Sequence, residues 1–102
     1  MANILSGTVT VATAGTRVAF PSARKKCVWI KVTAREGNTG VVYFGDVTVS
    51  SSNGYTLYQG TDGVNNTTGP IPLLDVGGVD LSSLYLDSAS NGDKADFVAV
   101  FE

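Results

Sequence analysis

The fold is decided by the stretch CVWIKVTA, residues Cys27–Ala34. Successive side chains of a strand point to opposite faces, so this stretch predicts a strand with two distinct sides. The apolar face is predicted to consist of Val28, Ile30, Val32 and Ala34. The opposite face is predicted to consist of Cys27, Trp29, Lys31 and Thr33.

A second run, VVYFGDVTV at residues 41–49, is equally rich in the β-branched and aromatic residues that favour strands. The two runs are separated by REGNTG at residues 35–40, where glycine and asparagine accept the backbone angles of a turn. We therefore expect a β-hairpin on which the other strands pack.

Six further segments have the composition of strands and are separated by turn signals. They are residues 7–13, 17–20, 55–58, 70–74, 84–86 and 95–101. The segment with Pro70 and Pro72 must lie at an edge or in an extended crossing, because proline donates no backbone hydrogen bond. Asp80 is expected to cap one helical turn. This pattern predicts an all-β, single-domain antiparallel β-sandwich or jelly roll of about eight short strands.

The 102 residues provide room for one domain, residues 1–102, with no internal repeat. Residues 1–6 are expected to form either an N-terminal arm, with Ile4 and Leu5, or a frayed end. Residues 59–69 are expected to form the longest surface loop, since they are polar, contain glycine and lack a period.

Charged residues are only 16 % of the chain, whereas soluble domains usually carry about 25 %. Because interface cores are depleted of charge, this favours an assembly over an ordinary Thr/Ser-rich sandwich. Residues 1–35 carry a formal charge of +6 and the remainder −8. The two halves either form a dipole that docks on an oppositely charged surface, or interleave in the sheets and cancel.

The single cysteine, Cys27, allows no internal disulfide and is expected to be a small buried side chain in a protein made in a reducing cytoplasm. Residues 1–20 resemble no signal peptide, and no stretch reaches the length of a membrane helix. We therefore expect no membrane partner.

Catalytic chemistry has little support in the sequence. There is no histidine, which excludes histidine-based triads and histidine metal sites. The aspartates mostly occupy turn segments, where backbone reasons favour them, so a carboxylate pair for glycoside hydrolysis is the weaker interpretation. Asp93, Asp96 and Asn91 match no dedicated calcium loop. We expect no enzyme activity, no cofactor and no metal.

The run of Arg24, Lys25 and Lys26 precedes Trp29, an arrangement that could serve nucleic acid, an acidic protein face or simply a solvated loop. The acidic sequence pI of about 4.8 argues against nucleic acid. The aromatic residues could form a sugar-stacking platform, a protein interface or part of the core. Both faces of residues 95–101 are apolar, so one of them requires a partner.

The chain resembles the small jelly-roll decoration, or cement, proteins of tailed-bacteriophage capsids. The residues that carry this resemblance are Gly7-Thr8-Val9, Ala14-Gly15-Thr16 with Val18, Cys27 with Ile30, Asn38-Thr39-Gly40 with Val42-Tyr43-Phe44-Gly45, Gly54-Tyr55 with Leu57, Leu81-Ser82 with Leu84-Tyr85, and Val98 with Val100. The resemblance implies a homotrimer that sits on the capsid surface, binds the major capsid protein and stabilises the shell. Synthesis is then expected in the host cytoplasm.

These expectations define one set of candidate interface residues: Ile4, Leu5, Arg24, Lys25, Lys26, Trp29, Tyr43, Phe97 and Phe101. The alternative function is a carbohydrate- or receptor-binding domain of a phage fibre or tail. It requires Trp29 or a pair of tyrosines exposed in a groove.

Overall fold

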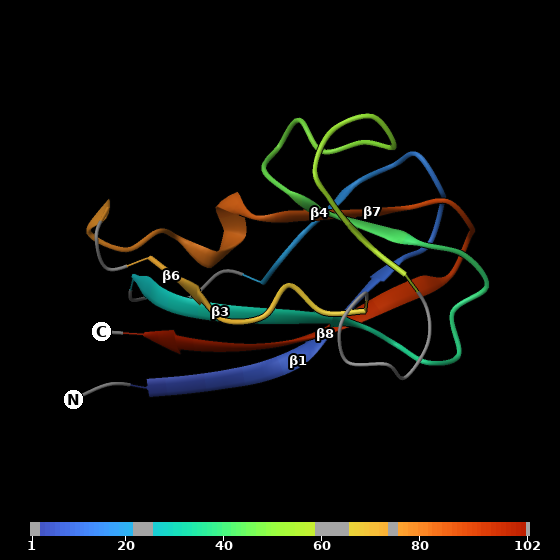
Figure 1. The fold of residues 1–102 in the computed structure, drawn as a ribbon. Helices are drawn as coiled ribbons and strands as arrows, with labels where there is room; N and C mark the ends of the chain where they lie inside the picture. The colour runs from blue at the N-terminus through green and yellow to red at the C-terminus, as the bar shows by residue number, and fades with distance from the viewer. Residues whose placement is uncertain (1–2, 22–25, 59–65, 74–75, 102) are drawn as a thin grey trace.

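The computed structural model describes residues 3–21, 26–58, 66–73 and 76–101. Eight strands and one 3₁₀ turn are formed in this part of the chain (Figure 1). They are β1 (Asn3–Val11), β2 (Val18–Ala19), β3 (Cys27–Ala34), β4 (Val42–Gly45), β5 (Tyr55–Leu57), β6 (Ile71–Pro72), η2 (Leu81–Ser83), β7 (Tyr85–Ser88) and β8 (Asp93–Phe101). No helix among these residues is long and apolar enough to cross a membrane.

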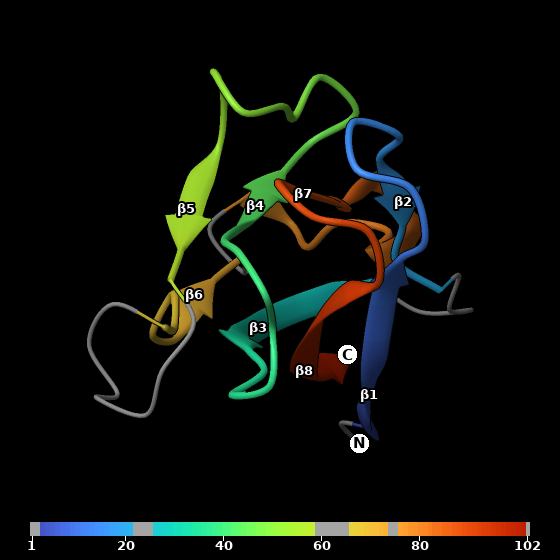
Figure 2. The ribbon, with the colours of Figure 1, turned by 90° about the vertical axis from the view of Figure 1, so that its right-hand side faces the viewer.

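The strands form two four-stranded sheets, with the orders β1-β8-β3-β6 and β2-β7-β4-β5. We call the first the long sheet and the second the short sheet. All neighbours within each sheet are antiparallel. The chain passes repeatedly from one sheet to the other, and Figure 2 shows the two layers. This order is that of a jelly roll, which confirms the predicted fold class.

The predicted hairpin of residues 27–34 and 41–49 is wrong, because β3 lies in the long sheet and β4 in the short sheet. The connection, residues 35–41, is long enough to cross between the layers, and hydrogen bonds hold it at the start of β8. Asn38 exchanges side-chain hydrogen bonds with the backbone of Lys94 at 2.8 and 3.0 Å. The apolar faces of the two strands therefore meet across the core and not side by side.

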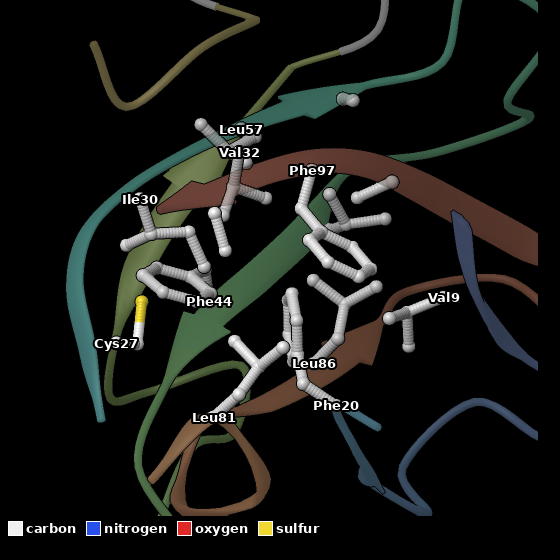
Figure 3. Packing of buried hydrophobic residues seen from close by; sticks show 14 of the residues in the cluster. Val9, Phe20, Cys27, Ile30, Val32, Phe44, Leu57, Leu81, Leu86 and Phe97 are labelled. Atoms are coloured by element: carbon white, nitrogen blue, oxygen red, sulfur yellow. The ribbon is translucent and has the colours of Figure 1, made fainter. Parts of the chain in front are cut away.

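The core lies between the sheets and contains four phenylalanines, of which Phe20, Phe44 and Phe97 are labelled in Figure 3. The Phe20 ring packs edge-on against Phe44, with 5.5 Å between the ring centroids. It also packs in a tilted arrangement against Phe97, at 5.2 Å. Burial of large aromatic side chains is a major stabilising contribution in a domain of this size. The core thus joins residues from β4 and β8 with one that follows β2.

Alternation along β3 holds from Trp29 to Ala34 but fails at its start. The pairing of β3 with β8 shifts register between Cys27 and Trp29, which is a β-bulge. The inserted residue returns Cys27 to the core face and leaves Val28 half-buried. The predicted placement of these two residues on the faces is therefore wrong, whereas the predicted burial of Cys27 is confirmed.

The prediction that residues 1–6 form an N-terminal arm or a frayed end is wrong for residues 3–6, and residues 1–2 lie outside the described residues. Instead β1 begins at Asn3, and Ile4 and Leu5 lie opposite Val100 and Ala99 of β8. The apolar spacing of this segment is weak, but β8 supplies an antiparallel partner along the whole of β1.

The expected long loop falls in two parts. Residues 59–65 lie outside the described residues, whereas Asn66, Thr67 and Thr68 run along β3. The Ala34 N–H donates to the Asn66 carbonyl at 2.7 Å, and Thr68 N–H donates to the Val32 carbonyl at 2.9 Å. This part of the loop therefore extends the edge of the long sheet.

Three further predictions concern the ends of elements. The edge position of Pro70 and Pro72 is confirmed, since β6 pairs only with β3. Asp80 caps η2, as predicted, by accepting from the Ser82 N–H. The strand predicted at residues 41–49 ends early at Gly45, because the Asp46 carboxylate accepts from both the N–H and the hydroxyl of Thr48 and so forms a turn.

Candidate interaction surface

The outer face of the long sheet, turned away from the core, is set by the alternation of β8. Phe97, Ala99 and Phe101 are buried against the short sheet, which directs Val98 and Val100 outward. Val98 is 40 % exposed. The sequence pattern predicted these two apolar sides, and among the described residues only the core-facing side is covered by a second sheet.

The register of the long sheet assembles a line of apolar side chains across all four strands. Ile4 of β1 lies opposite Val100 of β8, Val100 lies opposite Trp29 of β3, and Trp29 lies opposite Pro72 of β6. We call these four residues the apolar row. Ile4 is 72 % exposed, Pro72 is exposed, and Trp29 and Val100 are half-buried. Val98 is a second outward apolar side chain on β8, and it lies between Ser6 of β1 and the exposed Lys31 of β3.

The other end of the same face is polar. The Thr8 hydroxyl donates to the Asp96 carboxylate at 2.6 Å, and the Arg35 guanidinium lies 3.5 Å from the same carboxylate oxygen. Both members of this ion pair are about half exposed, so it contributes little to stability. The outer face is therefore apolar near the start of β1 and polar toward its end.

The structure brings together two of the predicted interface residues, Ile4 and Trp29, in the apolar row. Leu5 is exposed but pairs with the buried Ala99, so it lies on the other side of the sheet from Ile4. Tyr43 is half-buried on β4 of the short sheet and is not part of this surface.

Phe97 and Phe101 must be removed from the candidate interface. Each is only 3 % exposed, because odd-numbered positions of β8 face the core. Lys26 is exposed immediately before β3. Arg24 and Lys25 lie outside the described residues.

Two members of the row, Val100 and Pro72, were not among the predicted interface residues. The alternation of β8 already placed Val100 opposite the Phe97 face, so this signal was available in the sequence. Pro72 carries no such signal, because its position depends on the pairing of β6 with β3.

A polar hollow of about 510 Å³ lies at one end of the sandwich, where β8 begins. It is lined by Arg35, Gly37, Asn38, Thr39, Asn91, Gly92, Asp93 and Lys94. The buried Asp93 carboxylate accepts one hydrogen bond from the Thr39 N–H and another from the Gly40 N–H, both at 2.8 Å. This carboxylate therefore holds the crossing connection and has both oxygens engaged.

Two other described aspartates, Asp80 and Asp87, have separate structural roles. Asp87 accepts from the Gly15 and Ser88 N–H groups at 3.0 and 2.8 Å, and Asp80 caps η2. Hydrogen bonds from the backbone and hydroxyl of Ser82 lower the pKa of Asp80. Within the described ranges, no three acidic or cysteine side chains gather as a metal site would require.

The positive and negative halves of the sequence interleave. β8 comes from the acidic half and lies between β1 and β3 of the early half. The contact between Arg35 and Asp96 joins the two halves directly. Of the two alternatives for the charge asymmetry, cancellation within the sheets is the one that this arrangement supports.

No protein-family model and no curated protein sequence matches the chain. Among solved structures, it is similar to a chain of the Bacillus endospore appendages, a novel family of disulfide-linked pili, with a TM-score of 0.58 and 9 % identity over 98 % of this chain and 83 % of that chain. It is also similar to a chain of the cyanophage Pam1 capsid asymmetric unit, with a TM-score of 0.48 and 13 % identity over 97 % of this chain and 81 % of that one. At identities this low, the likeness to the appendage chain establishes a shared fold and no shared function.

Proposed function

We propose that this chain is a non-enzymatic virion structural protein, a capsid decoration protein that binds the phage head shell as an oligomer. The apolar row on the outer face of the long sheet is the observation that carries the proposal. The resemblance of the sequence to decoration proteins and the jelly-roll fold both agree with it.

Single exposed apolar side chains are ordinary, but a continuous row of them across a sheet is a feature of interaction sites. The row includes Trp29, and tryptophan is one of the residues that contribute most to interface affinity. The row itself contains no charged residue, in keeping with the depletion of charge in interface cores, and the exposed Lys31 lies beside it, opposite Val98. This surface fits an apolar seam on the shell or a neighbouring copy.

The polar groups of the fold agree with this role, because they are engaged in holding turns and connections. Asp80, Asp87 and Asp93 use their oxygens to hold turns and connections. A structural protein needs such fixed loops, and the proposal assigns no catalytic step, metal or cofactor to them.

The proposed assembly is noncovalent. The appendage pili that share this fold are disulfide-linked. Here the single cysteine, Cys27, is buried in the core, and its thiol donates to the Trp29 carbonyl at 3.3 Å. A disulfide to a neighbour would require the core to open, so contacts through the outer face are the simpler route.

The test uses phage heads that lack this protein, prepared from the phage that encodes it. Heads are incubated with purified protein and sedimented, and the bound protein is quantified. A variant with Ile4→Ser and Trp29→Ser should lose at least tenfold in affinity, whereas Tyr55→Ser, at an exposed residue of the short sheet, should bind as the native chain does. Equal binding by all three proteins, or no binding by the native chain, would contradict the proposal.

The basic run singled out from the sequence provides a separate test. Replacing Arg24, Lys25 and Lys26 by serine should weaken attachment at low salt and have less effect at high salt, because salt screens the attraction between charges. Occupancy that does not change at either ionic strength would remove the run from the shell contact.

A carbohydrate- or receptor-binding domain of a fibre or tail is the second candidate. Tyr55 and Tyr58 favour it, since they are 52 % and 54 % exposed near the same edge of the short sheet. Glycan-array binding that saturates and is abolished by Tyr55→Ser and Tyr58→Ser, together with no attachment to heads, would favour this candidate over the first.

A further inference from the structure

The two sheets have four edge strands, and three of them are protected. β2 and β6 have two residues each, and β5 has three. Pro70 and Pro72, which cannot donate a backbone hydrogen bond, lie at the β6 edge. Short strands and prolines are the usual means by which proteins prevent their edges from pairing with other chains.

The fourth edge, β1, has none of these protections. Its sequence NILSGTVTV contains nine residues without a proline or a charge, and its pairing with β8 runs through all nine without a bulge. Residues 4–8 are exposed. Figure 1 shows β1 at the outer edge of the long sheet, with β8 on one side only.

The opposite edge of the long sheet shows what a covered edge looks like. Along the parts of β3 that β6 does not reach, other segments bind its backbone. The Thr68 N–H donates to the Val32 carbonyl at 2.9 Å, and Cys27 and Val79 exchange two backbone hydrogen bonds at 2.7 and 2.9 Å. On β1, by contrast, the backbone of residues 4–10 bonds to β8 and to no other segment that the structure describes. In an antiparallel pair about half of the backbone groups point away from the partner strand, so those of β1 point to the open edge.

We infer that the open edge of β1 pairs antiparallel with β1 of a second copy of this chain, around a two-fold axis. The length of β1 identifies its partner strand as another β1. Every other described edge strand has three residues or fewer and could cover only a third of β1. Charge agrees with it, since two uncharged strands meet without repulsion.

The register follows from the bounds of the strand. Gly7 is the midpoint of Asn3–Val11, so an axis at Gly7 pairs all nine residues of both strands. Ser6 then lies opposite Thr8 of the partner subunit, and Ile4 lies opposite the partner's Thr10. In this register, residues on the outer face of one long sheet lie opposite residues on the outer face of the other. The two long sheets then join into one sheet of eight strands, with about eight to ten new backbone hydrogen bonds.

This inference stands on the edge itself and does not depend on the proposed virion role. The contact is two-fold, whereas the resemblance to decoration proteins implies a three-fold seam. A chain that makes both contacts forms assemblies with an even number of copies, and a chain that makes only the edge contact forms dimers.

The test exploits the pairing of Ser6 with the partner's Thr8. The variant Ser6→Lys/Thr8→Lys places lysines opposite each other twice, which should raise the dissociation constant of the pair at least tenfold. The variant Ser6→Glu/Thr8→Lys places glutamate opposite lysine twice and should keep or strengthen the pair. Light scattering and sedimentation velocity over a range of concentrations give the masses.

The two variants share Thr8→Lys, which keeps a partner within its own chain because position 8 lies opposite Asp96. Val98→Lys is the control for the sheet face, since it adds a lysine beside Ser6 on the next strand and should leave the edge contact intact. Circular dichroism confirms that each variant is folded.

Hydrogen exchange of the native chain gives a second, mutation-free result: the outward amides of residues 4–10 should become protected as concentration rises. A native chain that is a monomer at millimolar concentration would overturn the inference. So would a trimer with unprotected β1 amides, or identical masses for the two charge variants.

Discussion

Replacing Asp93 by asparagine provides a sharp test of how the two sheets are connected. The Asp93 side chain is buried at the start of β8, and its two oxygens accept from the Thr39 and Gly40 N–H groups, both at 2.8 Å. Asparagine keeps one acceptor and turns an amide N–H₂ group toward the second backbone N–H. One hydrogen bond to a charged acceptor is lost, which costs about 1.5–3 kcal/mol.

We therefore expect Asp93→Asn to lower the free energy of unfolding by about 2 kcal/mol, or the melting temperature by roughly 8–16 °C in a domain of this size. Urea unfolding followed by the fluorescence of Trp29 and by circular dichroism measures the change. The protein concentration is fixed, so that any self-association contributes equally to each measurement.

The matched control is Asp80→Asn, which makes the same chemical change at an exposed cap. Asparagine is as good a capping residue as aspartate, so this variant should stay within about 0.5 kcal/mol of the native chain. If the two variants have equal stabilities, the role assigned to Asp93 in holding residues 39 and 40 is refuted.

Three further predictions concern the core and one turn. Phe97→Ala should cost about 3–5 kcal/mol in urea unfolding, and a loss no larger than that of Val98→Ala would contradict the assigned faces of β8. Burial raises the pKa of the Cys27 thiol above its ordinary value of 9.0, so this group favours the folded state below that pH and its contribution is lost as pH rises further. The free energy of unfolding should therefore fall above about pH 9 more steeply in the native chain than in Cys27→Ala, and equal slopes would exclude the effect. Gly54→Ala should destabilise by about 1–3 kcal/mol, since φ is +131° and an added Cβ would lie 2.6 Å from a Val49 methyl carbon; a thermal melt that does not shift would refute this.

The sequence predicted the faces of the long strands well, because burial on one side of a sheet imposes a period of two on the side chains. Ile30, Val32 and Ala34 are buried as the pattern of β3 required, and the two sides of β8 are as expected. The pattern failed at Val28, where a bulge inserts a residue without a local signal. It also failed to exclude Phe97 and Phe101 from the interface, since both faces of β8 are apolar and hydropathy alone does not choose between them.

The pairing of the strands was harder to predict from the sequence than their faces. A turn-rich segment between two strands favours a hairpin locally, yet residues 35–41 cross between the sheets because Asn38 and Asp93 bind them to the start of β8. These contacts join residues more than fifty positions apart, and no local period records them.

By itself, then, the sequence determined that this chain is all-β, and which residues share a face of β8 and, from Trp29 onward, of β3. Only the tertiary structure decided that β3 pairs with β8, that Ile4, Val100, Trp29 and Pro72 form one row, and that β1 has an open edge. The reason is physical: alternation reflects the burial of each strand separately, whereas neighbours are chosen by backbone hydrogen bonds and layer packing, to which every strand offers nearly the same groups.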